Sequence, residues 1–246
     1  MIGKSRATQR AHYGVDGPST VAILVLATSG LLAGAAAALT ARRRAGLLLL
    51  TAGLLEAFRA GTYLYATMRG KFVVWEREVD GLDLTGTEQV LDLGCGTGAV
   101  LLTVARRLTT GRAVGLDLWR PGDQFGNTEA ATRRNADAEG LADRIDLVTG
   151  DMRALPFENA CFDIVVSSLA VHNIPGADGR RVAVTEALRV LRPGGRLLLA
   201  DALHVDEYAA TLRQALALDV SVRSLGWRVW YGGPWFVLST VTARKP

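Results

Sequence analysis

The sequence has little cysteine and little charge for its length. Its 246 residues contain two cysteines, Cys95 and Cys161, which are too few and too far apart for a zinc site or a disulfide framework. We therefore expect no metal site, and reduced thiols as in a cytosolic protein. Charged residues make up 21% of the chain and hydrophobic residues 49%. This balance excludes intrinsic disorder and indicates a segment more apolar than an ordinary core.

The net charge of +4 is unevenly distributed along the chain. Residues 1–70 hold eight Lys or Arg and two acidic residues, so the remaining chain, with 20 basic and 22 acidic residues, is slightly negative. A nucleic-acid-binding protein needs basic residues on its folded domain to neutralise phosphates. We therefore expect no nucleic-acid partner, and a membrane surface as the partner of the basic N-terminal part.

Two apolar stretches follow the N-terminus. Residues 20–41 carry no charge, and as a helix they are long enough to cross the roughly 30 Å hydrocarbon layer of a bilayer. After three arginines at 42–44, residues 45–68 predict a second helix that is amphipathic or marginally spanning. We expect a basic tail over 1–19, membrane-associated helices over 20–70 and the main domain over 71–246.

The sequence leaves the topology of these helices open. Two spanning helices put the N-terminus and the main domain on one side and the three arginines on the other, against the positive-inside tendency. A single span and a hairpin that dips into one leaflet are the alternatives. A cleaved signal peptide or a buried helix of a soluble fold would also be apolar, but the uncharged stretch is longer than either requires.

Beyond Lys71, short β-branched runs alternate with helical stretches, which predicts an α/β fold with a parallel sheet. The last segment, residues 220–243, has two strand-like runs joined by Gly232, Gly233 and Pro234 with no helix between them. It predicts an antiparallel hairpin at the end of the sheet. The predicted strands are 89–93, 113–116, 145–149, 163–167 and 196–200, and the predicted helices lie near 99–108, 127–139, 178–191 and 206–217.

A glycine-rich turn follows the first predicted strand. Gly94, Gly96 and Gly98 lie between a strand and a helix, where missing Cβ atoms allow a ligand to approach the backbone and the helix N-terminus offers free N–H groups. Asp117 ends the next strand, where a carboxylate can accept both hydroxyls of a ribose. The pattern predicts a site for an adenosine-containing cofactor.

The identity of that cofactor depends on further motifs, because the glycines also satisfy the dinucleotide pattern G-x-G-x-x-[GA]. Asp92 precedes the first glycine, Gly150-Asp151-Met152 follows the third strand, and residues 191–196 (LRPGGR) precede the fifth. Together these motifs resemble class I S-adenosylmethionine-dependent methyltransferases, especially the small-molecule branch that includes ubiquinone and menaquinone biosynthetic enzymes. The resemblance covers residues 72–246 and implies a Rossmann-like, seven-stranded, mostly parallel sheet.

The resemblance also implies roles for residues of the site. The aspartate and glycines of the turn would line the methionine end of S-adenosylmethionine, Asp117 would hold the ribose, and Asp151 with Met152 would face the adenine edge. Trp119 either stacks on the adenosine or covers the sheet edge, and Met152 is alternatively a core residue. The predicted cofactor-binding residues are Asp92, Gly94, Cys95, Gly96, Gly98, Asp117, Leu118, Trp119, Asp151, Met152 and Ser167.

Two histidines are candidate catalytic bases. His172 follows the fourth predicted strand and His204 follows the fifth, so both lie at the edge of the sheet where acceptors bind in this fold. The resembling family often has two adjacent histidines here, whereas Asn173 follows His172. The alternative for both is hydrogen bonding within a loop. The loop 123–127 either closes over the cofactor or is solvated.

The C-terminal segment is rich in aromatic residues. Trp227, Trp230, Tyr231 and Trp235 lie within nine residues. Such a cluster forms core, an apolar acceptor pocket, or an interfacial belt on the bilayer that holds the N-terminal helices.

We therefore expect a membrane-associated methyltransferase at the cell membrane, with its catalytic domain facing the cytoplasm. Its acceptor would be a lipophilic small molecule: a quinone or isoprenoid precursor, a lipid amine or a hydrophobic thiol. The alternatives are a NAD(P)-dependent reductase that uses the same glycine turn, and a non-catalytic, membrane-tethered factor. The sequence leaves the methylated element and the oligomeric state open. The negative domain and the lack of an Asn-Pro-Pro-Tyr-like tetrad disfavour a nucleic-acid methyltransferase.

Overall fold

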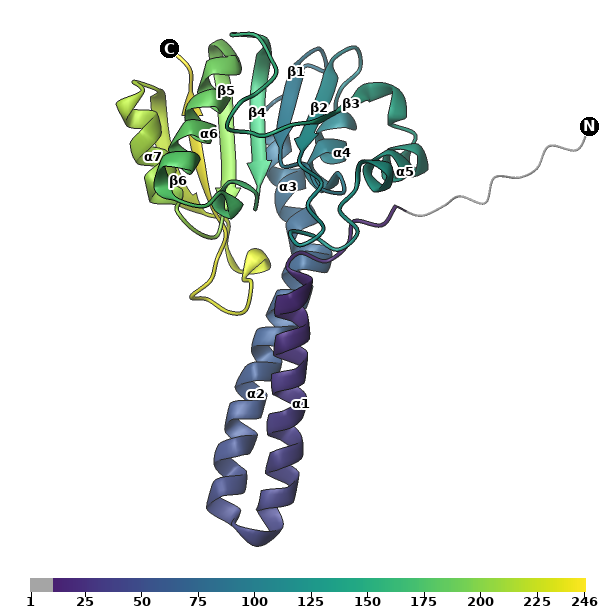
Figure 1. The fold of residues 1–246 in the computed structure, drawn as a ribbon, viewed down its shortest axis with the longest axis vertical. Coiled ribbons are helices and arrows are strands. Elements are labelled where there is room, and N and C mark those ends of the chain that lie inside the picture. The colour runs from purple at the N-terminus through teal and green to yellow at the C-terminus, as the bar shows by residue number, and fades with distance from the viewer. Residues whose placement is uncertain (1–10) are drawn as a thin grey trace, which may run out of the picture.

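A computed structural model describes residues 11–246 of the chain, so the predicted basic tail residues Lys4, Arg6 and Arg10 lie outside the described residues. An α/β domain carries a long two-helix hairpin that projects from it (Figure 1). The hairpin consists of α1 (Pro18–Ala41) and α2 (Arg43–Tyr65).

The sheet at the centre of the domain has seven strands in the order β3-β2-β1-β4-β5-β7-β6. The first five strands are parallel, and β7 pairs antiparallel with both β5 and β6. The predicted Rossmann-like, mostly parallel sheet with an antiparallel C-terminal pair is therefore confirmed. The strands are β1 (Gln89–Leu93), β2 (Arg112–Asp117), β3 (Ile145–Thr149), β4 (Phe162–Ser168), β5 (Leu191–Asp201), β6 (Leu218–Ser224) and β7 (Ser239–Arg244).

Helices cover both faces of this sheet. Side chains of α3, α4 and α5 form one buried hydrophobic cluster with it, and side chains of α6 and α7 form a second cluster. The chain therefore has the three-layer α/β/α architecture that buries a parallel sheet on both faces. The domain's helices are α3 (Lys71–Asp80), α4 (Ala99–Ala105), α5 (Glu129–Glu139), α6 (Ala177–Val190) and α7 (Val205–Gln214).

The segment that connects the two C-terminal strands, β6 and β7, differs from the sequence prediction. The two strands are antiparallel neighbours, but residues 225–238 between them form a long loop with a 3-10 turn, η4 (Trp227–Val229), instead of a tight hairpin turn. Leu238, buried at its end, and Val229 join the main hydrophobic cluster. All four of the predicted aromatic residues lie in this loop, and the rings of Trp227 and Tyr231 pack against Tyr65 and Tyr63 of α2.

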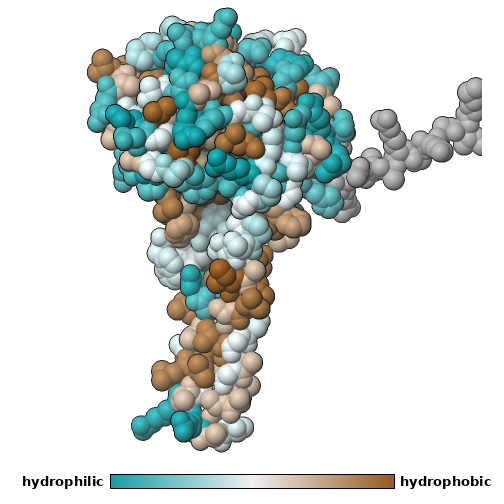
Figure 2. Space-filling view, in the orientation of Figure 1, coloured by the Kyte–Doolittle hydropathy of each residue, from teal (hydrophilic) through white to brown (hydrophobic). Residues whose placement is uncertain are grey.

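The two hairpin helices pack closely through small residues. A Cβ on Gly46 would lie 2.7 Å from the backbone nitrogen of Leu39, and one on Gly53 would lie 2.7 Å from Leu32. Most of the outward apolar surface is uncovered, with Leu26 71% and Leu48 74% exposed. Figure 2 shows a mostly hydrophobic hairpin between a hydrophilic tip and the domain. Both helices are long and apolar enough to cross a membrane.

The second hairpin helix continues into the α/β domain. The sequence predicted its end at residue 68, which is wrong: a π-helix, η1 (Ala66–Gly70), joins α2 directly to α3, so one helical path runs to Asp80. The α3 side chain of Trp75 is buried and donates a hydrogen bond from Nε1 to Ser168 Oγ, 2.9 Å away. The hairpin is therefore continuous with an element packed against the sheet.

Candidate active site

The glycine turn lies between β1 and α4, as predicted. Gly94, Gly96 and Gly98 have φ values of 71°, 53° and 92°, a region that other residues rarely adopt. A Cβ on Gly94 would lie 2.2 Å from the Ala170 Cβ, and one on Gly96 would lie 2.6 Å from Gln124 Oε1. The turn therefore needs glycine at these positions both for its backbone conformation and for space.

Asp117 at the end of β2 fastens this turn to the neighbouring strand. Its Oδ2 accepts a hydrogen bond from the Gly96 N–H at 2.9 Å, and its Oδ1 accepts one from the Trp119 N–H at 2.6 Å. The Asn127 side chain donates a third at 3.3 Å. Because an ionised carboxylate has about four acceptor positions, Asp117 can also accept hydrogen bonds from a bound ligand.

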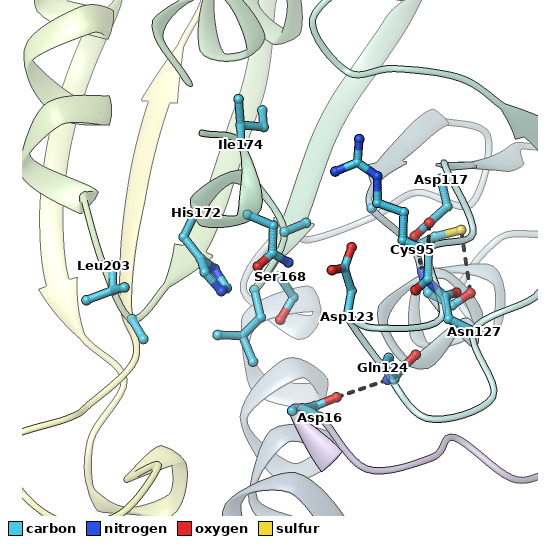
Figure 3. Close-up of a pocket in the computed structure, with 18 of the residues that line it drawn as sticks. Asp16, Cys95, Asp117, Asp123, Gln124, Asn127, Ser168, His172, Ile174 and Leu203 are labelled. Atoms are coloured by element: carbon cyan, nitrogen blue, oxygen red, sulfur yellow. Dashed lines mark hydrogen bonds between the residues drawn. The ribbon is translucent and has the colours of Figure 1, made fainter. Parts of the chain in front are cut away.

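A cleft of about 610 Å³ opens along the carboxyl ends of the parallel strands. Figure 3 shows its two sides, with Asp117, Cys95 and Asn127 on one and His172 between Ser168 and Leu203 on the other. Burial raises the pKa of the Cys95 thiol, which is therefore neutral and unreactive. The predicted site residues that line the cleft are Asp92, Gly94, Cys95, Gly96, Asp117, Leu118, Asp151, Met152 and His172.

Four predicted site residues lie outside the cleft lining. Gly98 caps the N-terminus of α4, and Trp119 donates from Nε1 to Thr149 Oγ1, which holds it over the edge of the sheet. Ser167 is buried and donates to the Leu93 carbonyl. His204 lies before α7, with Nδ1 2.8 Å from Glu207 Oε1. The structure thus places these four in supporting positions: Trp119 and Ser167 bond neighbouring strands, and Gly98 and His204 lie at the starts of helices.

Asp92 is the most unusual group in the cleft. It is 2% exposed, and neither carboxylate oxygen has a hydrogen-bond partner. Burial, and secondarily the charge of Asp117, raise its pKa to about 8. A buried carboxylate without partners suits a ligand that brings a positive charge or N–H donors.

Replacement of Asp92 with Asn tests this burial in the ligand-free protein. From pH 4 to pH 8 the folded state holds the Asp92 proton while the unfolded chain releases it, so the wild-type free energy of unfolding falls as pH rises through this window. Asn cannot ionise. We expect the stability of Asp92→Asn relative to wild type to increase across this window, on the order of a few kcal/mol, and to be constant above it.

Urea unfolding of both proteins at pH 5 and pH 8 measures this difference. Asp178→Asn is the matched control, because that side chain is 92% exposed. A stability difference between Asp92→Asn and wild type that is the same at both pH values would contradict the assigned environment of Asp92.

His172 lies beside a buried carboxylate. Its Nδ1 is 2.6 Å from Asp201 Oδ1, within ion-pair range but outside hydrogen-bond direction, and its backbone N–H donates to Asp201 Oδ2 at 3.1 Å. Asp201 is 2% exposed and also accepts from the Tyr208 hydroxyl at 3.2 Å. The hydrogen bond to the backbone and the neighbouring carboxylate hold His172 at the edge of the cleft, with one side of its imidazole toward Asp201.

Asp16 was not identified by the sequence analysis, although it links four parts of the chain. Its carboxylate accepts from Lys71 Nζ at 2.8 Å, Thr67 Oγ1 at 3.0 Å, Tyr231 OH at 3.0 Å and Gln124 Nε2 at 2.9 Å. Figure 3 shows the bond to Gln124. No sequence motif marks this network, because its members are far apart in the chain.

The same network reaches the glycine turn. Gln124 Oε1 accepts from the Thr97 N–H at 2.9 Å, and Thr97 Oγ1 donates to the Tyr13 carbonyl at 2.7 Å. The loop 123–127 therefore contacts the turn through Gln124, and three of its residues, Asp123, Phe125 and Gly126, are exposed. Its closure over a bound cofactor stays a prediction. Residues 12–16, part of the predicted N-terminal tail, also lie against the turn. The predicted domain boundaries stay predictions.

Comparisons with known proteins agree with this site. Residues 91–199 match the family described as "Methyltransferase domain". The chain is 36% identical over 129 residues to the ubiquinone/menaquinone biosynthesis C-methyltransferase UbiE of Roseobacter denitrificans, covering 51% of this chain and 47% of that protein. It is 29% identical over 127 residues to the sterol 4-C-methyltransferase strm-1 of Caenorhabditis elegans, covering 52% and 35%.

Solved structures show the same fold. The [4+2]-cyclase SpnF matches with a TM-score of 0.57 and 21% identity, over 70% of this chain and 80% of that one. A geranyl diphosphate methyltransferase in complex with SAM matches with a TM-score of 0.53 and 15% identity, over 70% and 85%. The chain spans about half the length of the curated relative UbiE. None of these matches extends over the whole of this chain.

Proposed function

We propose that this chain is a membrane-attached, S-adenosylmethionine-dependent enzyme that methylates a lipophilic small molecule. Its residues 91–199 match a methyltransferase domain. The observation that carries this proposal is the composition of the cleft. The glycine turn and the base of the apolar hairpin line one continuous cavity, to which the hairpin contributes Thr20, Arg59 and Tyr63.

The cleft fits S-adenosylmethionine, which supplies a methyl group on a positively charged sulfur when it is bound. Asp92 is an unpaired buried carboxylate, as a cationic ligand requires. Gly94 and Gly96 expose the backbone of the turn, and Asp117 retains acceptor positions for ribose hydroxyls. The family match favours this cofactor over a nicotinamide dinucleotide, whose pyrophosphate would bring negative charge to a cleft where burial already keeps Asp92 protonated.

The acceptor side of the cleft supports a lipophilic substrate. Leu203, Trp235 and Phe236 line it, and these side chains are 43%, 61% and 37% exposed. Apolar side chains at the mouth of a cavity favour an apolar ligand. Relatives are named for quinone, sterol and geranyl diphosphate methylation, so we propose a quinone or isoprenoid precursor as the acceptor class.

We also propose that the hairpin inserts in the cell membrane, with the catalytic domain on the cytoplasmic side, where S-adenosylmethionine is made. The two helices are antiparallel and close-packed, so the N-terminal end of α1 and the α/β domain lie at the same end of the hairpin (Figure 1). A bilayer location concentrates apolar acceptors near the cleft.

Label transfer from the cofactor tests the proposed function. Full-length protein in native membranes is incubated with S-adenosylmethionine that carries a labelled methyl group, and the lipid extract and the aqueous fraction are analysed separately. We expect label in a lipid-extractable small molecule. Label that appears only in aqueous metabolites, or in protein, would contradict a lipophilic acceptor.

We propose His172 as the base that removes a proton from the acceptor, with Asp201 as its positioning residue. Replacement of His172 with Ala should lower turnover about 100-fold at saturating cofactor, a typical effect of losing a general base. The affinity for S-adenosylhomocysteine should change less than about twofold, because among the described residues the polar partner of His172 is Asp201 and not the glycine turn.

Asp201→Asn separates the roles of the two residues. If Asp201 positions the imidazole, Asp201→Asn should lower kcat and leave the KM for S-adenosylmethionine unchanged, whereas a purely structural role would change both. Turnover of the His172→Ala protein within threefold of wild type would remove this histidine from the mechanism.

A further inference from the structure

A second hollow lies outside the active-site cleft, on the other side of α2. It has a volume of about 370 Å³ and is formed where α2 meets the loop 225–238. Figure 1 shows this yellow loop beside the domain-proximal end of the hairpin. We call it the junction groove, and its lining residues are Phe58, Gly61, Thr62, Tyr65, Trp227 and Trp230.

The junction groove is apolar and open. Phe58, Tyr65 and Trp227 are 47%, 36% and 54% exposed, and the Tyr65 and Trp227 rings stack with centroids 5.4 Å apart. A Cβ on Gly61 would meet no atom within 4 Å. The floor of the groove therefore has room for an apolar chain, and the stacked rings form a firm wall.

Two arginines border the groove on its domain side. Arg69 follows Tyr65 by four residues along the helical path, and Arg228 adjoins Trp227, whose ring its guanidinium covers at 4.8 Å. A Cβ on Gly70 would lie 1.7 Å from the Arg228 carbonyl oxygen, so the two arginine-bearing segments touch. Among the described residues, neither arginine has an acidic partner within ion-pair distance.

The position of the groove along the hairpin matches a membrane interface. A hydrocarbon layer of about 30 Å takes about 20 helical residues. Counted from the arginines at the tip, 42–44, this length ends near Tyr65 on α2. Along the hairpin toward the domain, the apolar groove therefore lies at the level of the acyl chains, the aromatic rings at the interface and the arginines at the headgroups.

We propose that the junction groove binds one anionic glycerophospholipid of the bilayer, with an acyl chain in the groove and the phosphate at Arg69 and Arg228. This inference rests on the proposed membrane attachment. Arginine binds phosphate through paired N–H donors, and a guanidinium already stacked on an indole loses little freedom on binding. The lipid would join the hairpin to the C-terminal loop whose Tyr231, Trp235 and Phe236 line the cleft.

The test uses full-length protein in nanodiscs of phosphatidylcholine with about 30% phosphatidylglycerol, which gives the bilayer a negative surface potential. After detergent extraction, mass spectrometry counts the phosphatidylglycerol molecules retained per protein. Gly61→Leu fills the groove without a clash, and Arg69→Gln with Arg228→Gln removes the phosphate site. We expect each variant to lower retained phosphatidylglycerol at least fivefold.

Matched controls separate the groove from general effects. Gly30→Leu makes the same change on α1, where a Cβ also meets no atom within 4 Å, and Arg213→Gln removes an exposed arginine of α7. Both should retain phosphatidylglycerol as wild type does. Three results would overturn the proposal and leave membrane attachment standing. The groove variants could retain as much phosphatidylglycerol as wild type, or wild type could retain as much phosphatidylcholine as phosphatidylglycerol. In the third, a long-chain isoprenyl quinone would displace the lipid. Failure of the wild-type protein to enter the nanodisc would overturn both the lipid site and the membrane attachment.

Discussion

Replacement of Asp16 with Ala is expected to lower the free energy of unfolding by about 3–5 kcal/mol, the usual effect of removing one partner from a buried ion pair. Its partner Lys71 has a side chain that is only 7% exposed, and Asp16 itself is 17% exposed. The substitution leaves the ammonium of Lys71 and the hydroxyl of Tyr231 without their acceptor. Asp16→Asn keeps the shape and loses the charge, so its effect should be smaller.

Urea unfolding monitored by circular dichroism, with the protein in one detergent throughout, measures these stabilities. Asp178→Ala is the matched control and should change stability by less than about 0.5 kcal/mol, since its side chain is 92% exposed. A loss below about 1 kcal/mol for Asp16→Ala would mean that the network is a surface arrangement with no stabilising role.

Replacement of Asp117 with Ala is expected to weaken S-adenosylhomocysteine binding at least 100-fold, equivalent to about 2.7 kcal/mol. Hydrogen bonds to a charged group contribute about 1.5–3 kcal/mol each, and the variant removes those to the ligand ribose. It also frees the Gly96 and Trp119 N–H groups that fix the turn. Both effects act on the cofactor and leave the sheet intact.

Calorimetric titration gives the affinity directly. Asp146→Ala changes an exposed aspartate near the opposite end of the neighbouring strand β3, and it should bind S-adenosylhomocysteine as wild type does. Asp117→Asn should fall between Ala and wild type, because the amide oxygen still accepts one hydrogen bond. Affinity of the Ala variant within threefold of wild type would place the ribose elsewhere.

The predictable parts of the fold are those that local sequence patterns determine. The glycine turn can be recognised in the sequence, because three positive-φ positions between a strand and a helix tolerate little but glycine. Alternation of apolar runs and helices gave the first four parallel strands to within one residue, whereas the prediction for the fifth, 196–200, was too short because β5 begins at Leu191. The position of Asp117 follows from β2, since parallel strands end at the same edge.

The remaining parts depend on long-range packing that no local pattern encodes. Asp16 contacts Tyr231 across most of the chain, and the placement of β7 between β5 and β6 depends on which edge strand pairs best. The end of α2 was mispredicted because η1 continues the helix through Gly70, a residue that normally interrupts one but here allows close approach to η4. His204 follows the fifth strand, as a residue at the acceptor edge should, but its side chain pairs with Glu207 of the adjoining helix α7.

The most direct test of the central claim is a calorimetric titration of the full-length protein in nanodiscs with S-adenosylhomocysteine, NAD and NADP. We predict that S-adenosylhomocysteine binds at one site, in competition with S-adenosylmethionine, and that neither dinucleotide gives measurable heat. Saturable binding of NAD or NADP, with none of S-adenosylhomocysteine, would contradict it.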